Sequence, residues 1–191
     1  MQFDDGSSLR LYRQTVEDFG IYTGMELNPE EYDRLQRAAS EMSAKMRAVR
    51  IISATNISKK DLENRLIQKG EKPTQAKEAI GWLEDLHLLD DARTAEQIVH
   101  SCISKGYGLS RAKQALYEKR IPKEYWEEAL SDYPDQKERI LSFLKSRLQS
   151  SSDEKAVKKA IDALLRRGHS YGSIRSALSE LQLESDDFLE E

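Results

Sequence analysis

The side chains with the most reactive chemistry are few and far apart in this chain. It has three histidines and one cysteine among 191 residues. His100 and Cys102 lie two positions apart on a predicted helix, and side chains at that spacing do not face each other. The pair Asp90-Asp91 directly precedes an apolar helical stripe, where aspartate typically caps a helix N-terminus rather than holding a cation. We therefore predict no catalytic residues, no metal site and no cofactor.

The basic residues are more informative, because they gather in two segments of a chain whose formal net charge is −4. Six basic residues and one acidic residue lie in 105–123, and the same numbers lie in 155–175. Such clusters suit phosphates or an acidic protein surface, although solvated helix faces also carry them. The candidate partner-binding residues are Arg111, Lys113, Lys119, Arg120, Lys158, Lys159, Arg166, Arg167 and Arg175.

Three tyrosines, Tyr107, Tyr117 and Tyr171, lie near these bases in the sequence. They are suited either to stacking on nucleic-acid bases or to filling small helical cores. A run of six acids and no base follows from Glu180 to Glu191, which we expect at one end of the molecule.

An internal repeat organises the helices that carry the bases. Leu66, Leu116 and Leu164 each precede a helix stop, at offsets of 50 and 48 residues, and the apolar positions after them keep the same register. A period of this length is typical of stacked helical units. The residues that we expect to be buried at the repeated stripe positions are Leu116, Trp126, Leu164, Ile174 and Leu178.

The helix stops themselves give a second prediction. Gly70 and Gly168 occupy equivalent stops and should have a positive φ, as glycine does just after a helix. Arg120 stands at the matching position, where its side chain resists that conformation. We therefore predict that the middle repeat turns there without a left-handed residue.

The predicted fold is all-α, with about three tandem three-helix repeats in an elongated array after a small N-terminal extension. Asn28-Pro29 marks a helix start inside this extension, and the segments Leu9–Tyr12 and Phe19–Tyr22 could pair as a β-hairpin. The predicted divisions are the extension, 1–52, and the three repeats, 53–106, 107–150 and 151–191.

The cysteine count and the hydrophobic pattern of the chain restrict the cellular compartment that we expect for it. A single cysteine cannot form an intrachain disulfide, the N-terminus resembles no secretory signal, and no apolar run approaches the roughly 20 residues of a membrane span. We expect a cytoplasmic protein with no membrane contact.

Three motifs resemble those of the RecX family of recombination regulators, and the resemblance as a whole covers roughly 53–181. The start Leu89-Asp90-Asp91 followed by Ala95 is one, the string from Gly108 to Ile121 is the second, and Arg166-Arg167-Gly168-His169-Ser170-Tyr171 is the third. The chain departs from the family at Ala112 and Ala115, where a branched apolar residue and a glutamate are usual. It also departs at Arg120, where glycine is usual.

The resemblance implies tandem three-helix repeats and a modulator, mostly an inhibitor, of the RecA recombinase. Such a protein lies in the groove of the RecA–DNA filament and hinders strand exchange, ATP hydrolysis and repressor cleavage, with no chemistry of its own. The expected partner is the RecA filament, with a weak DNA contact, no small-molecule substrate and a monomeric chain. The residues alone leave three rivals open: a direct DNA reader built on helix pairs, a helical scaffold for peptides, and an enzyme.

Overall fold

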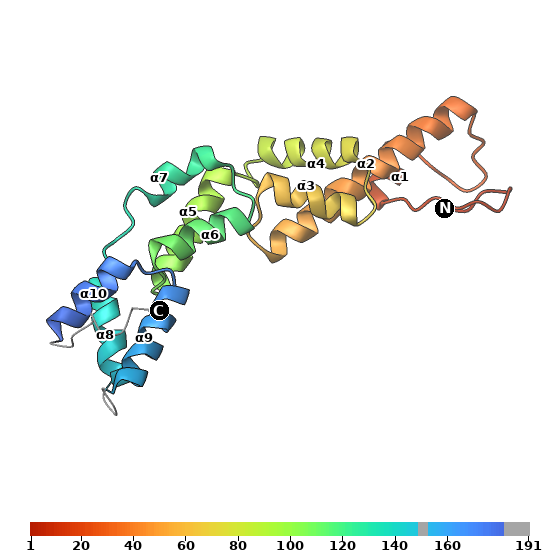
Figure 1. Ribbon diagram of the computed structural model, residues 1–191. Coiled ribbons are helices and arrows are strands. Elements are labelled where there is room, and N and C mark those ends of the chain that lie inside the picture. Colours follow the sequence, from red (N-terminus) through yellow and green to blue (C-terminus); the bar gives the residue numbers. More distant parts are fainter. Residues whose placement is uncertain (149–152, 182–191) are drawn as a thin grey trace. The chain divides into compact units, whose positions relative to one another are not determined.

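The computed structural model describes residues 1–148 and 153–181, and the regular secondary structure of these residues is helical (Figure 1). They form ten α-helices and a short 3-10 turn, which confirms the predicted all-α class. The chain divides at Asp90 into two compact units, Met1–Asp90 and Asp91–Glu191. Within the described part, no helix is both long and apolar enough to cross a membrane. The acids from Glu184 onward lie outside the described residues.

The first unit contains four helices: α1 (Arg13–Asp18), α2 (Pro29–Ala54), α3 (Lys59–Gln68) and α4 (Pro73–Asp85). Helix α2 begins where the sequence predicted. The Asn28 side chain accepts a hydrogen bond from the Glu31 N–H at 2.9 Å, and the Glu31 carboxylate accepts one from the Asn28 N–H at 3.0 Å. Pro29 follows at the first helical position, where its missing N–H costs nothing. This reciprocal cap fixes the start of the longest helix.

The core of the first unit lies between α2, α3 and α4. Ala44 and Ala48 are fully buried on α2, so small side chains allow α4 to approach closely. One buried acid, Glu71, forms an ion pair with Arg47 at 2.8 Å and accepts a hydrogen bond from the Ser43 hydroxyl at 3.1 Å. These contacts offset the desolvation of the carboxylate.

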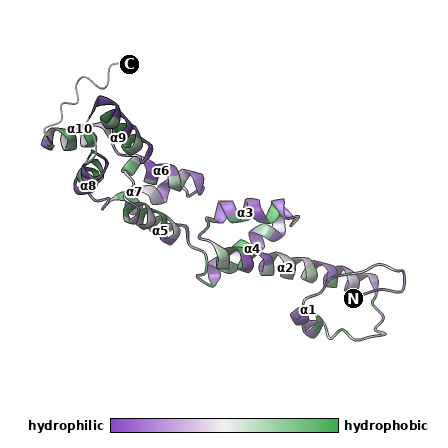
Figure 2. Cartoon of the chain, turned by 90° about the horizontal axis from the view of Figure 1, so that it is seen from below, coloured by the Kyte–Doolittle hydropathy of each residue, from purple (hydrophilic) through white to green (hydrophobic). Residues whose placement is uncertain are grey.

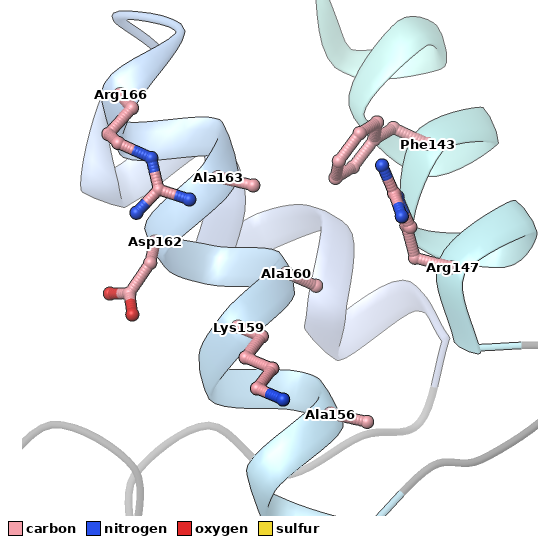
Figure 3. A pocket seen from close by; sticks show the side chains of 8 residues that line it. All are labelled: Phe143, Arg147, Ala156, Lys159, Ala160, Asp162, Ala163 and Arg166. Atoms are coloured by element: carbon pink, nitrogen blue, oxygen red, sulfur yellow. The ribbon is translucent and has the colours of Figure 1, made fainter.

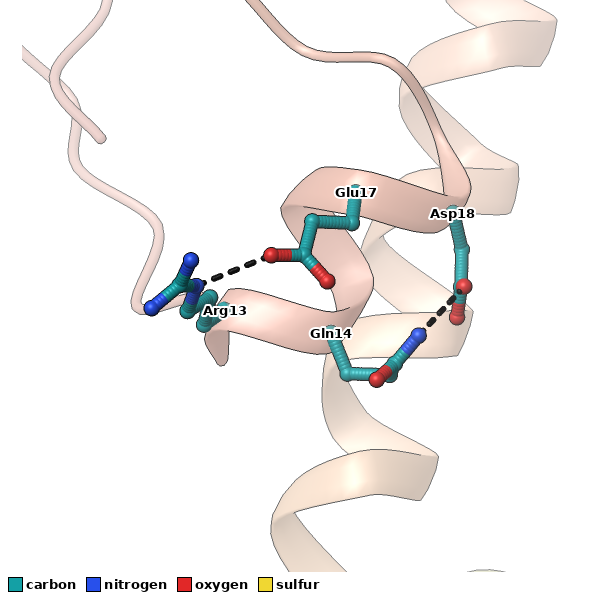
Figure 4. Close-up of polar contacts among 4 residues, drawn as sticks. All are labelled: Arg13, Gln14, Glu17 and Asp18. Atoms are coloured by element: carbon teal, nitrogen blue, oxygen red, sulfur yellow. Dashed lines mark hydrogen bonds and ion pairs between the residues drawn. The ribbon is translucent and has the colours of Figure 1, made fainter.

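The predicted N-terminal β-hairpin is wrong. Among the described residues the extension holds only an isolated antiparallel bridge between Gln2 and Ser8, and Arg13–Asp18 forms the helix α1 instead. An isolated hairpin is marginal in water, whereas this helical turn is supported by Arg13–Glu17 and Gln14–Asp18, two polar pairs four residues apart at 2.8 Å each (Figure 4).

The second unit contains six α-helices and the 3-10 turn Lys123–Tyr125. Its helices are α5 (Asp91–Ser104), α6 (Leu109–Glu118), α7 (Trp126–Leu130), α8 (Lys137–Leu148), α9 (Glu154–Arg166) and α10 (Tyr171–Glu180). Each of these helices carries both hydrophilic and hydrophobic residues (Figure 2). This mixture is typical of helices that bury one face and expose the other.

Two separate cores group these helices. One lies among α5, α6 and α7 and the other among α8, α9 and α10. Helix α5 therefore packs with the two helices that follow it, although the division of the sequence into 53–106 and 107–150 places it with the two before. The period of about 50 residues is the same in either grouping. The periodicity alone does not determine at which helix a unit begins.

The predicted burial is confirmed at four positions and wrong at one. Leu116, Leu164, Ile174 and Leu178 are at most 1% exposed. Trp126 is only half-buried, because α7 has just five residues and Trp126 is its first. Its indole N–H donates to the Ile121 carbonyl at 3.0 Å, which anchors the ring at the edge of the core.

The backbone conformation at the helix ends differs from the prediction at one of three positions. Gly70 and Gly168 have φ values of +92° and +82°, as predicted, but Arg120 also has a positive φ, +55°, so the prediction for the middle repeat is wrong. The Arg120 N–H donates to the Tyr117 carbonyl at 2.9 Å, and the Ile121 N–H donates to the Leu116 carbonyl at 3.1 Å. These bonds, with the burial of Ile121, outweigh the roughly 1–2 kcal/mol cost of a left-handed arginine.

The two groups of the second unit meet at two glycine turns. The Gly108 N–H donates to the Arg167 carbonyl at 2.9 Å, and the Ser110 N–H donates to the Gly168 carbonyl at 3.2 Å. A Cβ at Gly108 would lie 2.1 Å from the Gly168 carbonyl oxygen, and one at Gly168 would lie 2.3 Å from the Arg111 nitrogen. Only glycine allows this approach. We call this contact the glycine junction.

Side chains reinforce the glycine junction. The Arg139 guanidinium, from α8, donates to the carbonyls of Ile103 and Ser104 at 2.7 and 3.2 Å, at the C-terminus of α5. This contact satisfies carbonyls that have no partner within their own helix. His169 is 7% exposed, and its Nε2–H donates to the Gly106 carbonyl at 3.1 Å. Burial lowers the pKa of His169, and the nearby Arg167 charge adds to this effect.

We predict that Gly108→Ala and Gly168→Ala each lower the free energy of unfolding by at least about 2 kcal/mol, because the added methyl group meets backbone atoms. Gly172→Ala is the matched control, since a Cβ there meets nothing within 4 Å and the residue lies inside α10. It should be neutral or stabilising by up to about 1 kcal/mol. Urea denaturation measures all three, and equal stability of the three variants would contradict the proposed role of the junction.

We also predict a pH dependence from His169. Because its folded pKa is lowered, its contribution to stability is complete above the ordinary value of 6.5 and is lost as the pH falls through the lowered folded value. The melting temperature of the parent protein should therefore fall more steeply below pH 6.5 than that of His169→Gln. Parallel curves for the parent and His169→Gln would refute this assignment.

Candidate anion-binding groove

A groove with a volume of about 410 Å³ runs between α8 and α9 (Figure 3). Figure 3 shows Phe143 and Arg147 extending from α8 toward the alanine-lined side of α9. The residues that line it are Phe143, Arg147, Ala156, Lys159, Ala160, Asp162, Ala163 and Arg166. We call this the α8–α9 groove.

The amphipathic pattern of α9 explains why a groove forms here. Val157, Ile161 and Leu164 are buried in the core with α8 and α10. The next positions around the helix, toward α8, are alanines, which leave space that longer side chains would fill. Lys159 and Arg166 border that space, seven residues or about two turns apart.

Phe143 holds two guanidinium groups beside the groove. The Arg147 Cζ lies 5.5 Å and the Arg167 Cζ lies 5.0 Å from the centre of its ring, within cation–π range. Phe143 and Arg147 are four residues apart on α8, so they share a face. The ring orients both charges without neutralising them.

The groove carries a local excess of positive charge. Within 1–148 and 153–181, no ion pair joins Arg147, Lys159, Arg166 or Arg167 to an acid, and Asp162 is the one acid that lines the space. The three cations that line the groove, against one carboxylate, leave a formal charge of +2, and Arg167 at the Phe143 ring brings the local sum to +3. An arrangement of this kind can bind phosphates or carboxylates by charge-assisted hydrogen bonds.

The structure brings together three of the bases that the sequence singled out: Lys159, Arg166 and Arg167. Lys158 is exposed on α9 but lies one residue, or about 100°, around the helix from Lys159 and does not line the groove. Arg175 is exposed on α10, and Lys119 and Arg120 follow the end of α6.

The remaining two bases lie on α6. Arg111 forms an ion pair with Glu118 at 3.1 Å, and hydrogen bonds from Gln114 and Arg111 lower the pKa of Glu118. Lys113 is exposed on the same helix. Arg111 is thus partly neutralised, in contrast to the groove cations.

Sequence reasoning missed Arg147 and Phe143. Both lie outside the two basic segments, and no single segment of the chain shows the groove, because its walls come from two helices. The available signal was the Phe143–Arg147 spacing of four residues on a predicted helix.

The tyrosines near the basic segments differ in position. Tyr117 is 68% and Tyr171 39% exposed, so both rings are open to a partner. Tyr107 is half-buried, and its carbonyl accepts a hydrogen bond from the Tyr133 hydroxyl at 2.6 Å. Burial raises the pKa of Tyr133 to about 12. Tyr107 and Tyr133 therefore belong to the packing between helices.

The residues considered for metal or nucleophilic chemistry do not gather. In the described parts of the chain, no group of three or more His, Cys, Asp or Glu side chains is placed to hold a metal ion. Helix α5 begins at Asp91, and Cys102 is buried on its apolar face, where burial raises the pKa of the thiol.

Comparison with known proteins adds a family match. Residues 90–130 match a family model described as RecX, second three-helix domain. This range covers α5, α6 and α7, the helices that share one core. The match and the packing thus support the same grouping of helices.

Curated relatives and solved structures agree with this match. A regulatory protein RecX from Vibrio parahaemolyticus is 28% identical over 75% of this chain and 95% of its own length, and one from Clostridioides difficile is 27% identical over 97% and 89%. The crystal structure of RecX from Lactobacillus salivarius has a TM-score of 0.65 at 26% identity, covering 76% of this chain and 98% of that one. A further RecX crystal structure, at 18% identity, has a TM-score of 0.68 and shows the same fold over 94% of this chain and 91% of that one.

Proposed function

This chain belongs to the RecX family of regulatory proteins, and from this premise we propose that it binds the RecA–DNA filament and inhibits the recombinase, ATPase and co-protease activities of RecA. It acts by occupying the filament groove, with no chemistry of its own. The contact is made by the α8–α9 groove and by the bases on α6 and α10.

The observation that carries the proposal is the charge of the α8–α9 groove. Arg147, Lys159, Arg166 and Arg167 have no acidic ion-pair partner among the described residues, so no ion pair within 1–148 and 153–181 neutralises them. DNA in the filament is a polyanion, and a local basic surface increases the rate of encounter with it. The formal net charge of −4 means that this attraction is local to a surface.

The remaining bases extend the proposed contact. Lys158 and Arg175 are exposed on α9 and α10, and Lys113, Lys119 and Arg120 lie on or after α6, all in the second unit. Surface charges attract and orient a partner, but they do not by themselves determine which protein binds. Specificity for RecA then comes from contacts with the recombinase protein, and the contact with DNA alone is weak.

We predict that Lys159→Glu/Arg166→Glu raises the concentration needed for half-inhibition of RecA ATP hydrolysis at least about tenfold, a loss of about 1.4 kcal/mol. Neither side chain has an ion pair within the described part of the chain, so the melting temperature should change little. The matched control is Lys72→Glu/Lys77→Glu, which makes the same change in net charge at exposed positions of the first unit and should inhibit normally.

Two outcomes would count against this proposal. Full inhibition by the folded groove variant at low salt would show that the contact lies elsewhere. Tight, sequence-selective binding of duplex DNA without RecA, at physiological salt, would instead favour a direct DNA reader.

If the groove cations contact phosphates, the double variant should also change the salt dependence of filament binding. The slope of the logarithm of the binding constant against the logarithm of the salt concentration should decrease by roughly two units.

A further inference from the structure

The chain contains an acidic segment that complements the α8–α9 groove in charge. Residues 182–191 include five acids and no base, together with three large apolar residues. The acids are Glu184, Asp186, Asp187, Glu190 and Glu191, and the apolar residues are Leu183, Phe188 and Leu189. We call residues 182–191 the acidic segment.

We propose that the α8–α9 groove binds the acidic segment of the same chain. The formal charge of the acidic segment is −5, against +3 for Arg147, Lys159, Arg166 and Arg167 with Asp162. Guanidinium groups pair with carboxylates in a bidentate geometry, and two arginines of the groove are already oriented by Phe143.

The acidic segment begins close enough to reach the groove. Leu181, which follows α10, packs on the same core as Leu141, Phe143 and Leu148 of α8. Ten further residues can span up to about 33 Å when extended. Helix α9, with 13 residues, is about 20 Å long, so the whole groove lies within the range of the acidic segment.

The chemistry of the groove also suits a mixed acidic and apolar ligand. Its α9 wall is made of Ala156, Ala160 and Ala163, with the ring of Phe143 opposite, and its borders are cationic. Apolar side chains can cover the alanines while carboxylates meet the bases. Because the ligand is tethered, its effective concentration is in the millimolar range, so even a weak intrinsic affinity suffices.

This contact would regulate the groove. Where the proposed function holds, and this consequence rests on it, an anionic partner must displace the acidic segment before it binds Lys159 and Arg166. The segment thus weakens non-specific binding to other polyanions, and a partner that makes additional protein contacts still displaces it. The contact between segment and groove does not itself require RecA and is measurable in the intact chain alone.

The test compares backbone amide chemical shifts of the intact chain with those of a variant of equal length in which the five acids are neutral. The variant is Glu184→Gln/Asp186→Asn/Asp187→Asn/Glu190→Gln/Glu191→Gln. We expect shift changes at Phe143, Arg147, Lys159, Ala163 and Arg166. These should disappear near 1 M salt, where the screening length is about 3 Å. In an Arg147→Glu/Arg166→Glu background, neutralising the acids should leave the groove shifts unchanged.

Shift changes confined to the end of α10 near Leu181 would overturn the inference. Changes at the groove that fade on about tenfold dilution would overturn it as well, because they indicate binding by a second copy rather than by the same chain. Inhibition of RecA is a separate readout. If the chain inhibits RecA but its groove shows no shift changes, this inference alone is refuted. If the acidic segment binds the groove but the chain has no effect on RecA, the proposed function alone is refuted.

Discussion

The backbone contact at the glycine junction determines the geometry of the second unit. Gly108 and Gly168 bring the turn after α5 against the turn after α9, and the Cβ distances of 2.1 and 2.3 Å leave no room for any other residue. This contact fixes where α9 ends, and therefore where Arg166 and Arg167 stand relative to Phe143 on α8. The placement of charge in the groove thus depends on two residues that carry no charge.

The glycine junction also includes the buried His169, and burial favours the neutral form of its imidazole by lowering its pKa. Its ring donates to the Gly106 carbonyl, while Arg167, two residues earlier, extends toward Phe143. Two residues of the same turn therefore have different roles, since His169 packs between the helix groups and Arg167 presents a cation. A chain of net charge −4 can in this way maintain a local cationic surface without a basic coat over the whole protein.

Sequence patterns predicted the parts of the fold that local rules control. The cap at Asn28 and the stop glycines follow from capping and backbone freedom. Helical periodicity, which is readable in a few residues, predicted the burial of Leu116, Leu164, Ile174 and Leu178. Arg120 was mispredicted because two backbone hydrogen bonds and the burial of Ile121 offset its strain, and a sequence does not show that compensation. The groove was only partly predicted, since Lys159 and Arg166 came from a basic segment while Phe143 and Arg147 came from a helix packed beside it.

Site-specific photo-cross-linking tests the central claim, that the α8–α9 groove faces the RecA–DNA filament. A photoreactive side chain at Ser146, exposed on α8 beside Arg147, should cross-link to the filament, and the yield should fall as salt rises. The same group at Thr74, exposed in the first unit, provides the comparison. The account predicts a strong, salt-sensitive product from position 146 and little from position 74. Equal yields from the two positions, or a product from position 74 alone, would contradict it.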